Sequence, residues 1–499
     1  MITKRIFEAA TLTTLLVFLI LPQYVWGATL EVENIAGCKT NGYWTSPTKY
    51  CDPRVASANV RAGDTITIKK AVYIDTGLTI LKDNITVLGN GATFKGNCTA
   101  FPQYCPSQWP GSIVYIFNAK GAKVSDLFFE WDPRAVIIAN GVTDLVIERI
   151  TAIWTGGSAI SMKGTNMALR DSHFEFNGLG TLTSTGGKGI SGEPVTIGGD
   201  GSTVTGNKFY NQTKSSLYFL DARKVYAADN HVKWACGPFY IGDGTKDSVF
   251  IDNLIEELAY IVDPATGQPG PCEIVAPLYN WNYGVSTGAG FLVAVGDTGT
   301  VPASCENSRN LIKGNVIRGK RPIGTKVSVN VWNADCTTNY GKPAKITDLY
   351  VADNIFDGID TNPVLGPNWK SLVVIQDDAK TINSSMQLSM HLVNNIFQNA
   401  PVGITIAGVN KPGLMQGLTV TNNHFWQVSK PKSLTTLLLG KTTTGDPLFK
   451  NLQYYDYHVL PQSSVVGAGT PVCPPTVYGM PLGCLSFMGA APDEGKYDQ

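Results

Sequence analysis

An asparagine recurs at one position of a short repeated pattern, and this feature restricts the fold more than any other in the sequence. The copies are Asn207, Asn230, Asn253, Asn315, Asn354, Asn395 and Asn423, and the first three are spaced 23 residues apart. An asparagine tolerates left-handed backbone geometry, and its amide can bond to a neighbouring copy. We therefore interpret the spacing as one coil of a stacked chain, with the asparagine at every bend.

The spacing between equivalent positions of the repeat also locates regular coils and interruptions elsewhere in the chain. Upstream, we assign the equivalent slot to Leu127, Arg149 and Ser172, at steps of 22 and 23 residues. After Asn253 the steps lengthen to 62, 39, 41 and 28 residues. Long loops are therefore expected to interrupt the stack in its second half.

A second motif, a short apolar strand closed by a polar residue or glycine, recurs within the coils at 135–141, 158–164, 193–199, 216–222 and 238–244. Alternation of β-branched and polar residues is typical of strands buried on one face. These segments are predicted to stack as one parallel sheet, the segments before the asparagines as a second, and the segments after them as a third. The residues expected to point inward are Ile160, Met162, Val195, Ile197, Tyr218 and Leu220.

The composition is typical of an all-β chain, and the balanced charge indicates no highly charged partner. Glycine is abundant at 52 residues, and only 16% of the residues are charged. The 39 basic and 39 acidic residues balance, so no net field attracts nucleic acid. A chain of this length usually divides into several domains, but stacked repeats escape that rule because each repeat buries its apolar face on its neighbours.

The N-terminus has the order of a secretory signal peptide over residues 1–27. Lys4 and Arg5 precede an apolar run from Leu12 to Leu21, and small residues follow. The run is shorter than the roughly 20 residues that a membrane helix requires, with an uncleaved anchor as the alternative. We predict a secreted or periplasmic protein with no membrane attachment after cleavage, a cap at 28–60, a β-helix at 61–470 and a tail at 471–499.

The ten cysteines favour disulfides in an oxidising compartment. The cysteines form five pairs of sequence neighbours, each of which brackets an expected loop. No pair has the spacing of a zinc site. The expected pairs are Cys38 with Cys51, Cys98 with Cys105, Cys236 with Cys272, Cys305 with Cys336, and Cys473 with Cys484.

With its repeats, its entry segment at 61–96 and its closing segment at 445–469, the chain resembles the pectin-lyase-like superfamily of right-handed parallel β-helices. The resemblance implies a single-stranded right-handed β-helix of three parallel sheets. It also implies a polysaccharide partner, bound on the outer face of the first sheet and cleaved by a lyase or a hydrolase. The signature motifs of the hydrolases and alginate epimerases are absent, so the sequence names no enzyme family within the superfamily.

A column of polar residues is expected on the outer face of the first sheet, at the sixth position of each strand motif. It contains Asn140, Lys163, Gly198, Asp221 and Asp243. Successive coils are about 4.8 Å apart, so Asp221 and Asp243 should be neighbours. Two close carboxylates either raise the pKa of one member or share a cation such as calcium.

The resemblance implies that Asp221 and Asp243 act as a hydrolase pair, or that Lys163 or Arg223 acts as the base of a lyase. Lys224 would help to line the groove. The alternative is that the two aspartates are turn residues whose carboxylates accept backbone N–H bonds.

Aromatic residues in two later loops are candidates for stacking on sugar rings, because they bury apolar ring faces while their polar ends stay wet. These are Trp281, Tyr283 and Trp332, and local loop packing is the alternative. His173, His231 and His424 each follow a bend residue and are interpreted as packing or surface residues. No cofactor is required by the sequence, apart from the calcium ion considered above.

The sequence thus predicts a secreted carbohydrate-active protein. The alternative is a non-catalytic β-helix that binds glycans as an adhesin, surface protein or spike.

Overall fold

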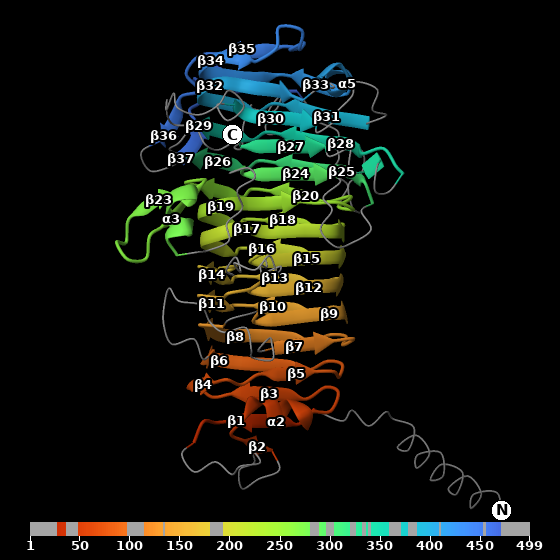
Figure 1. The fold of residues 1–499 in the computed structure, drawn as a ribbon, viewed down its shortest axis with the longest axis vertical. Coiled ribbons are helices and arrows are strands. Elements are labelled where there is room, and N and C mark those ends of the chain that lie inside the picture. Colours follow the sequence, from red (N-terminus) through yellow and green to blue (C-terminus); the bar gives the residue numbers. More distant parts are fainter. Residues whose placement is uncertain are drawn as a thin grey trace, which may run out of the picture.

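The computed structural model describes residues 27–35, 48–96, 114–132, 135–179, 193–279, 289–295, 304–319, 326–331, 336–337, 341–358, 371–377, 387–408, 411–452 and 456–470. Figure 1 shows an elongated stack of short strands, with successive coils lying one above another. In the described part, 33 strands join one parallel sheet that winds around the stack. The fold is the right-handed parallel β-helix that the sequence predicts.

The winding sheet has three faces, which we call the first, second and third sheets. The first sheet contains β5 (Leu78–Ile80), β7 (Val114–Phe117), β9 (Ile137–Thr143), β12 (Ile160–Thr165), β15 (Val195–Asp200), β24 (Phe291–Val295), β27 (Val327–Val331) and β30 (Ser371–Asp377). The second sheet contains β1 (Thr29–Val32), β2 (Lys49–Tyr50), β3 (Thr65–Ile68), β10 (Val146–Glu148), β13 (Ala168–Arg170), β16 (Thr203–Thr205), β18 (Tyr226–Ala228), β20 (Val249–Ile251), β25 (Glu306–Lys313), β28 (Lys345–Ala352), β31 (Gln387–Val393) and β33 (Leu418–Thr421).

The third sheet contains β4 (Val72–Ile74), β11 (Thr151–Ile153), β14 (His173–Glu175), β21 (Leu254–Glu256), β26 (Val316–Gly319), β29 (Ile355–Gly358) and β35 (Thr442–Thr444). Six longer strands continue around a bend: β6 (Thr86–Lys95) and β8 (Lys123–Glu130) from the second sheet into the third, and β17 (Lys208–Arg223), β19 (His231–Ile241), β32 (Ile396–Ala407) and β34 (Asn423–Lys432) from the third into the first.

In the described part of the chain, two antiparallel hairpins and three short helices lie outside the coils. The hairpins are β22 (Tyr260–Val262) with β23 (Pro269–Pro271), and β36 (Phe449–Asn451) with β37 (Asp456–Val459). The helices are α2 (Pro53–Ala58), α3 (Cys272–Leu278) and α5 (Lys411–Gln416). None of these described helices has the length and apolar character that crossing a bilayer demands.

The recurrent asparagines form a hydrogen-bonded ladder at the bend between the second and third sheets. The Asn253 side chain is typical, because its Oδ1 accepts from both nitrogens of Asn230 at 3.0 Å and its Nδ2 donates to Asn315 at 2.9 Å. The same bonds continue through the last copy, Asn423. Each amide satisfies a buried backbone N–H of the preceding coil, which is why an asparagine is required there.

The ladder begins at Ser172, whose backbone N–H donates to Asn207 Oδ1 at 3.0 Å. One upstream slot was predicted incorrectly. Thr151 pairs with Phe128 and with His173, so the slot holds Ile150 and not Arg149. Arg149 is the preceding residue and has left-handed geometry, with φ of 50°. Leu127 and Ser172 are in the predicted positions.

One apolar core runs through the stack, from Leu30 to Leu437. Four of the six residues expected to point inward are fully buried there, namely Ile160, Met162, Val195 and Ile197. The other two predictions are wrong, because Tyr218 and Leu220 face outward while Leu217 and Phe219 point inward. The register shifts between β15 and β17, because β17 has one extra residue between Phe219 and Ala222, at the left-handed Asp221. A one-residue bulge changes which side chains face the core.

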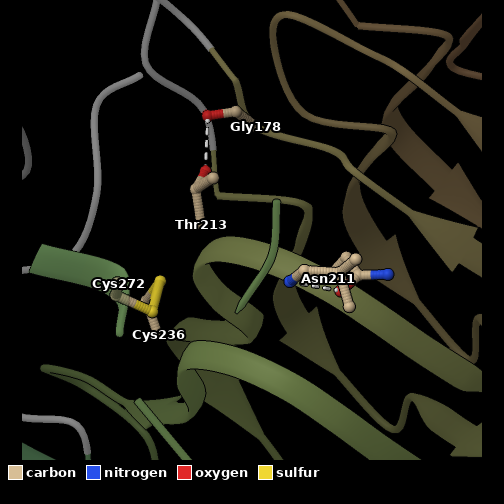
Figure 2. Close-up of a disulfide and its surroundings, with 6 residues drawn as sticks. Gly178, Asn211, Thr213, Cys236 and Cys272 are labelled. Atoms are coloured by element: carbon tan, nitrogen blue, oxygen red, sulfur yellow. Dashed lines mark hydrogen bonds between the residues drawn. A yellow bond between two sulfur atoms is a disulfide. The ribbon is translucent and has the colours of Figure 1, made fainter. Parts of the chain in front are cut away.

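Two of the predicted disulfides are confirmed, Cys236–Cys272 and Cys305–Cys336. The first joins β19 to the start of α3, and Figure 2 shows it beside Asn211 and Thr213 of β17. The other three predicted pairs involve residues outside the described part: Cys38, Cys98, Cys105, Cys473 and Cys484. Nearly all of the predicted signal peptide also falls outside it.

Candidate functional site

The acidic pair predicted on the first sheet is adjacent, as expected, but it does not face solvent as a pair. The Asp221 N–H donates to the Asp243 carbonyl oxygen at 2.7 Å, so the residues lie on neighbouring coils. Asp243 is only 4% exposed, which contradicts the prediction of an outward carboxylate. Asp221 has φ of 48° and occupies the left-handed bend beside Gly244. Both residues therefore lie where the backbone turns, and the catalytic role and the turn role of their carboxylates both stay predictions.

The basic residues of the predicted groove are exposed. Lys163 pairs with Asn140 and Gly198, and its Cγ would lie 3.7 Å from a Cβ at Gly198, so its stem crosses the space above that glycine. Arg223 and Lys224 follow at the next bend and are exposed. Trp281, Tyr283 and Trp332 lie outside the described residues.

A calcium site at Asp221 and Asp243 also stays a prediction. Ca²⁺ takes six to eight oxygen ligands, and two carboxylates supply only part of such a set. Among the described residues, no group of three or more His, Cys, Asp or Glu side chains is placed to hold a metal ion.

A different set of titratable side chains converges on the outer face of the third sheet. Tyr210 lies between two histidine rings, with centroid distances of 5.3 Å to His173 and 5.3 Å to His231, and both contacts are edge-on. Each histidine is held by a glutamate: His173 Nε2 lies 3.3 Å from Glu175, and His231 Nε2 lies 2.7 Å from Glu256. His173, His231 and Glu175 are about one-third exposed. We call these five residues the Tyr–His cluster.

The strands fix this cluster by register. His173 pairs with Lys208, which pairs with His231, so the three lie on consecutive coils. Two residues further along the same strands, Glu175 pairs with Tyr210. Side chains two residues apart on a strand point to the same face, and this places all five groups on one outer surface.

Tyr210, His231 and Glu256 form a continuous hydrogen-bonded chain. Tyr210 Oη lies 3.1 Å from His231 Nδ1, and the opposite ring nitrogen contacts Glu256 Oε2. Glu256 Oε1 accepts from the buried Arg318, at 2.9 Å from Nη2. When the His231 imidazole is neutral, the Tyr210 hydroxyl donates to its Nδ1 and its Nε2–H donates to the Glu256 carboxylate. This tautomer is inferred from the two hydrogen-bond partners.

The local charges keep the glutamates ionised and the tyrosine protonated. Burial alone would raise the pKa of Glu256, but the hydrogen bond from His231 and the charge of Arg318 outweigh it and lower the pKa. The hydrogen bond from His173 lowers the pKa of Glu175. Burial and then the charges of Glu256 and Glu175 raise the pKa of Tyr210. The cluster thus presents the neutral hydroxyl of Tyr210 beside an imidazole that a glutamate holds in place.

The insertion after β21 forms one wall of this site. Asn211, next to Tyr210, donates to Glu175 Oε1 at 2.9 Å and accepts from the Val262 N–H at 3.0 Å. The disulfide Cys236–Cys272 and the apolar contacts of α3 fix the same insertion to the coils. The insertion is therefore fixed beside the cluster.

Sequence reasoning missed the Tyr–His cluster. It treated His173 and His231 as packing or surface residues, which describes His424 correctly, since that ring is buried between Thr443 and Gly445. A usable signal was present: histidine occurs one position after the ladder slot in the two coils on either side of Asn207, and Tyr210 is three positions after Asn207 itself. Aligning the third-sheet strands by the repeat spacing would have brought His173, Tyr210 and His231 together.

Comparison with known proteins agrees with the fold. Residues 112–285 match the family model described as right handed beta helix region. The match agrees with the right-handed parallel β-helix that the structure shows. No curated protein matches the sequence.

Several solved structures are similar to this chain at low sequence identity. The surface adhesin PfbA of Streptococcus pneumoniae has a TM-score of 0.51 and 12% identity, over 74% of this chain and 85% of that one. The A-module of the mannuronan C-5 epimerase AlgE4 of Azotobacter vinelandii has a TM-score of 0.42 and 14% identity, over 77% and 91%. Pectate lyase Pel9A has a TM-score of 0.39 and 12% identity, over 94% and 97%. At these identities the likeness concerns the fold alone.

Proposed function

We propose that this protein cleaves an acidic polysaccharide by β-elimination at the Tyr–His cluster. The observation that carries the proposal is the position of Tyr210 between two imidazoles, each held by its own glutamate. One face therefore offers a proton acceptor and a proton donor on adjacent coils. This differs from the carboxylate pair that most glycoside hydrolases require.

In this reaction the base removes the proton from the carbon that carries the uronate carboxylate. The electrons of that C–H bond form a carbon–carbon double bond, and the glycosidic C–O bond breaks towards its oxygen. The leaving oxygen takes a proton from the acid, so the products are an unsaturated uronate and a free hydroxyl. The sugar chain is cut without adding water.

His173 suits the role of the base. Its Nε2 contacts the ionised Glu175, which leaves Nδ1 as the acceptor nitrogen. Tyr210 suits the role of the acid because its raised pKa keeps it protonated, and water can replace the proton it gives up because the site is partly exposed. Lys208 is exposed between the two histidines and would bind the uronate carboxylate. Neutralising that carboxylate acidifies the adjacent C–H bond.

The test is an assay of the purified protein against uronate-containing and neutral polysaccharides, with unsaturated products and reducing ends measured together. We expect both signals on a uronate polymer. Tyr210→Phe should lower the turnover by roughly 10² to 10⁴ without loss of folding. Tyr226→Phe, a matched change on the second sheet, should leave turnover unchanged.

The other outcomes discriminate between the remaining hypotheses. Reducing ends without unsaturated products would indicate hydrolysis and return attention to Asp221 and Asp243. Saturable glycan binding with no product on the whole panel would contradict the proposal and favour the non-catalytic adhesin.

A further inference from the structure

Resting on that proposed function, we infer that the Tyr–His cluster is the closed end of a groove along the third sheet. We also infer that Lys70 and Arg149, at the open end, bind a second anionic group of the sugar chain. The substrate is then the end of an acidic oligosaccharide, and it reaches the site from the N-terminal coils.

The closed end is made by the C-terminal hairpin. Leu254 lies one coil beyond His231 and already packs against a cluster that contains Val316, Ile355 and Tyr457. Tyr457 is 2% exposed, and its hydroxyl donates to Asp357 at 3.0 Å. In Figure 1, β36 and β37 lie beside β26 and β29 on the third-sheet side of the stack. A sugar chain on this face cannot continue past β21.

In the opposite direction the same face is open. The column that contains His173 continues through Thr151 and Phe128 to Thr93, and all are partly exposed. A shallow groove of about 400 Å³ lies there, lined by Lys70, Gly91, Thr93, Asp126, Leu127, Phe128, Arg149 and Thr151. The groove and the cluster thus share one strip of the third sheet.

The groove contains unused cationic donors. Arg149 has five N–H groups, of which three donate: Nε and Nη2 to Asp126 and Nη1 to Glu148. No described residue accepts from the other two, which leaves them for a ligand. Lys70 is exposed, and its stem lies 3.9 Å from a Cβ built at Gly91. The pairing with Asp126 holds the guanidinium rigidly, which lowers the entropic cost of binding an anion.

The position of Arg149 is itself unusual. It has left-handed geometry in a column whose other left-handed members are Asp126, Asp171, Gly206, Asp229, Asp252, Gly314, Asp353, Asn394 and Asn422. A long side chain is disfavoured in that conformation. Arg309 repeats the arginine–aspartate pair at a different bend, so the pair alone is a structural device. What distinguishes Arg149 is that it lines the groove.

The register sets the length of the substrate. Thr151 in the groove is two coils from Lys208, which corresponds to on the order of 10 Å. One sugar cannot contact both ends, so an oligosaccharide with at least two charged residues is required. Cleavage beside a closed end should release short products of one size from the start of the reaction.

The experiment measures binding in the Tyr210→Phe variant, so that it does not depend on turnover. Oligogalacturonates and oligomannuronates from dimer to hexamer are titrated by calorimetry. We expect affinity to rise sharply once the oligomer spans both ends. Lys70→Ala should weaken binding of the long oligomers by about tenfold and leave the dimer unchanged. Arg149→Gln should do the same, and Lys82→Ala, an exposed lysine at another bend, should have no effect.

Two results would overturn the inference while leaving the proposed function intact: equal affinity for all lengths with no effect of Lys70→Ala, or wild-type cleavage that yields a broad range of product sizes from the start. Failure of every oligouronate to bind, together with no cleavage of any polymer, would overturn the proposed function and this inference with it.

Discussion

Lys326 occupies an unusual position for a charged residue, and replacing it should stabilise the protein. Its side chain is fully buried, and its Nζ has no hydrogen-bond partner among the described residues. It lies near the charges of Asp357, Glu257 and Arg318, and its Nζ is 3.3 Å from a Cβ built at Gly319. Burial without a direct partner lowers the pKa of Lys326 to about 8, although Asp357 and Glu257 act in the opposite direction.

The size of the effect follows from this pKa. A fall from 10.5 to about 8 means that protonating Lys326 is about 3 kcal/mol less favourable in the folded chain than in the unfolded one. Between these two pH values the unfolded chain binds more protons, so the penalty is full below pH 8 and disappears as pH rises towards 10.5. Lys326→Met keeps most of the side-chain volume and removes the charge. We expect it to stabilise the protein at pH 7 by up to about 3 kcal/mol.

The assay is equilibrium urea unfolding of the wild type and Lys326→Met from pH 7 to pH 10. Other groups that titrate in this range cancel in the difference between the two proteins. The advantage of the variant should shrink from about 3 to about 1 kcal/mol across the range. Lys82→Met, at an exposed lysine, should change the stability little at any pH. A destabilised Lys326→Met, or an advantage that does not vary with pH, would refute the reasoning.

Three other predictions follow from the geometry. Asn253→Ala removes one rung of the ladder and should cost about 2 to 4 kcal/mol in urea unfolding, whereas the exposed Asn90→Ala should cost far less. Although burial opposes it, hydrogen bonds from three basic residues lower the pKa of Glu148 to about 2. Ionised Glu148 should stabilise the folded protein by about 1 to 2 kcal/mol, a value discounted because its three partners are half exposed. This stabilisation should be present above pH 4.5 and lost as pH falls towards 2. Comparison with Glu148→Gln by acid unfolding isolates it. Asp221→Asn and Asp243→Asn, made separately, should lower the melting temperature without changing turnover if both are turn residues; lost turnover with normal folding would instead support catalysis.

The fold was predictable because a β-helix is specified locally. Each coil repeats the same pattern of inward residues and bends, so residue spacing in the sequence maps directly onto position in the stack. The slot of Asn253 and the pairing of Cys236 with Cys272 follow from that map. The adjacency of Asp221 and Asp243 follows as well.

The direction in which a side chain faces was less predictable. The repeat spacing gives the number of residues per coil, but a single bulged residue reverses which side chains of a strand face the core. At Asp221 this reversed the orientations assigned to Tyr218 and Leu220. At Ile150 a one-residue error in the slot placed Arg149 incorrectly. The repeat period alone does not detect either change.

The sequence by itself thus determined the coil, its bends and the order of its sheets, because these depend on interactions between successive copies of one pattern. Only the tertiary structure decided which polar groups meet. His173, Tyr210 and His231 form a cluster because register aligns three coils, and the cluster is open on one side only because the C-terminal hairpin covers the neighbouring coils. Such contacts join residues distant in the chain, and no repeat encodes them.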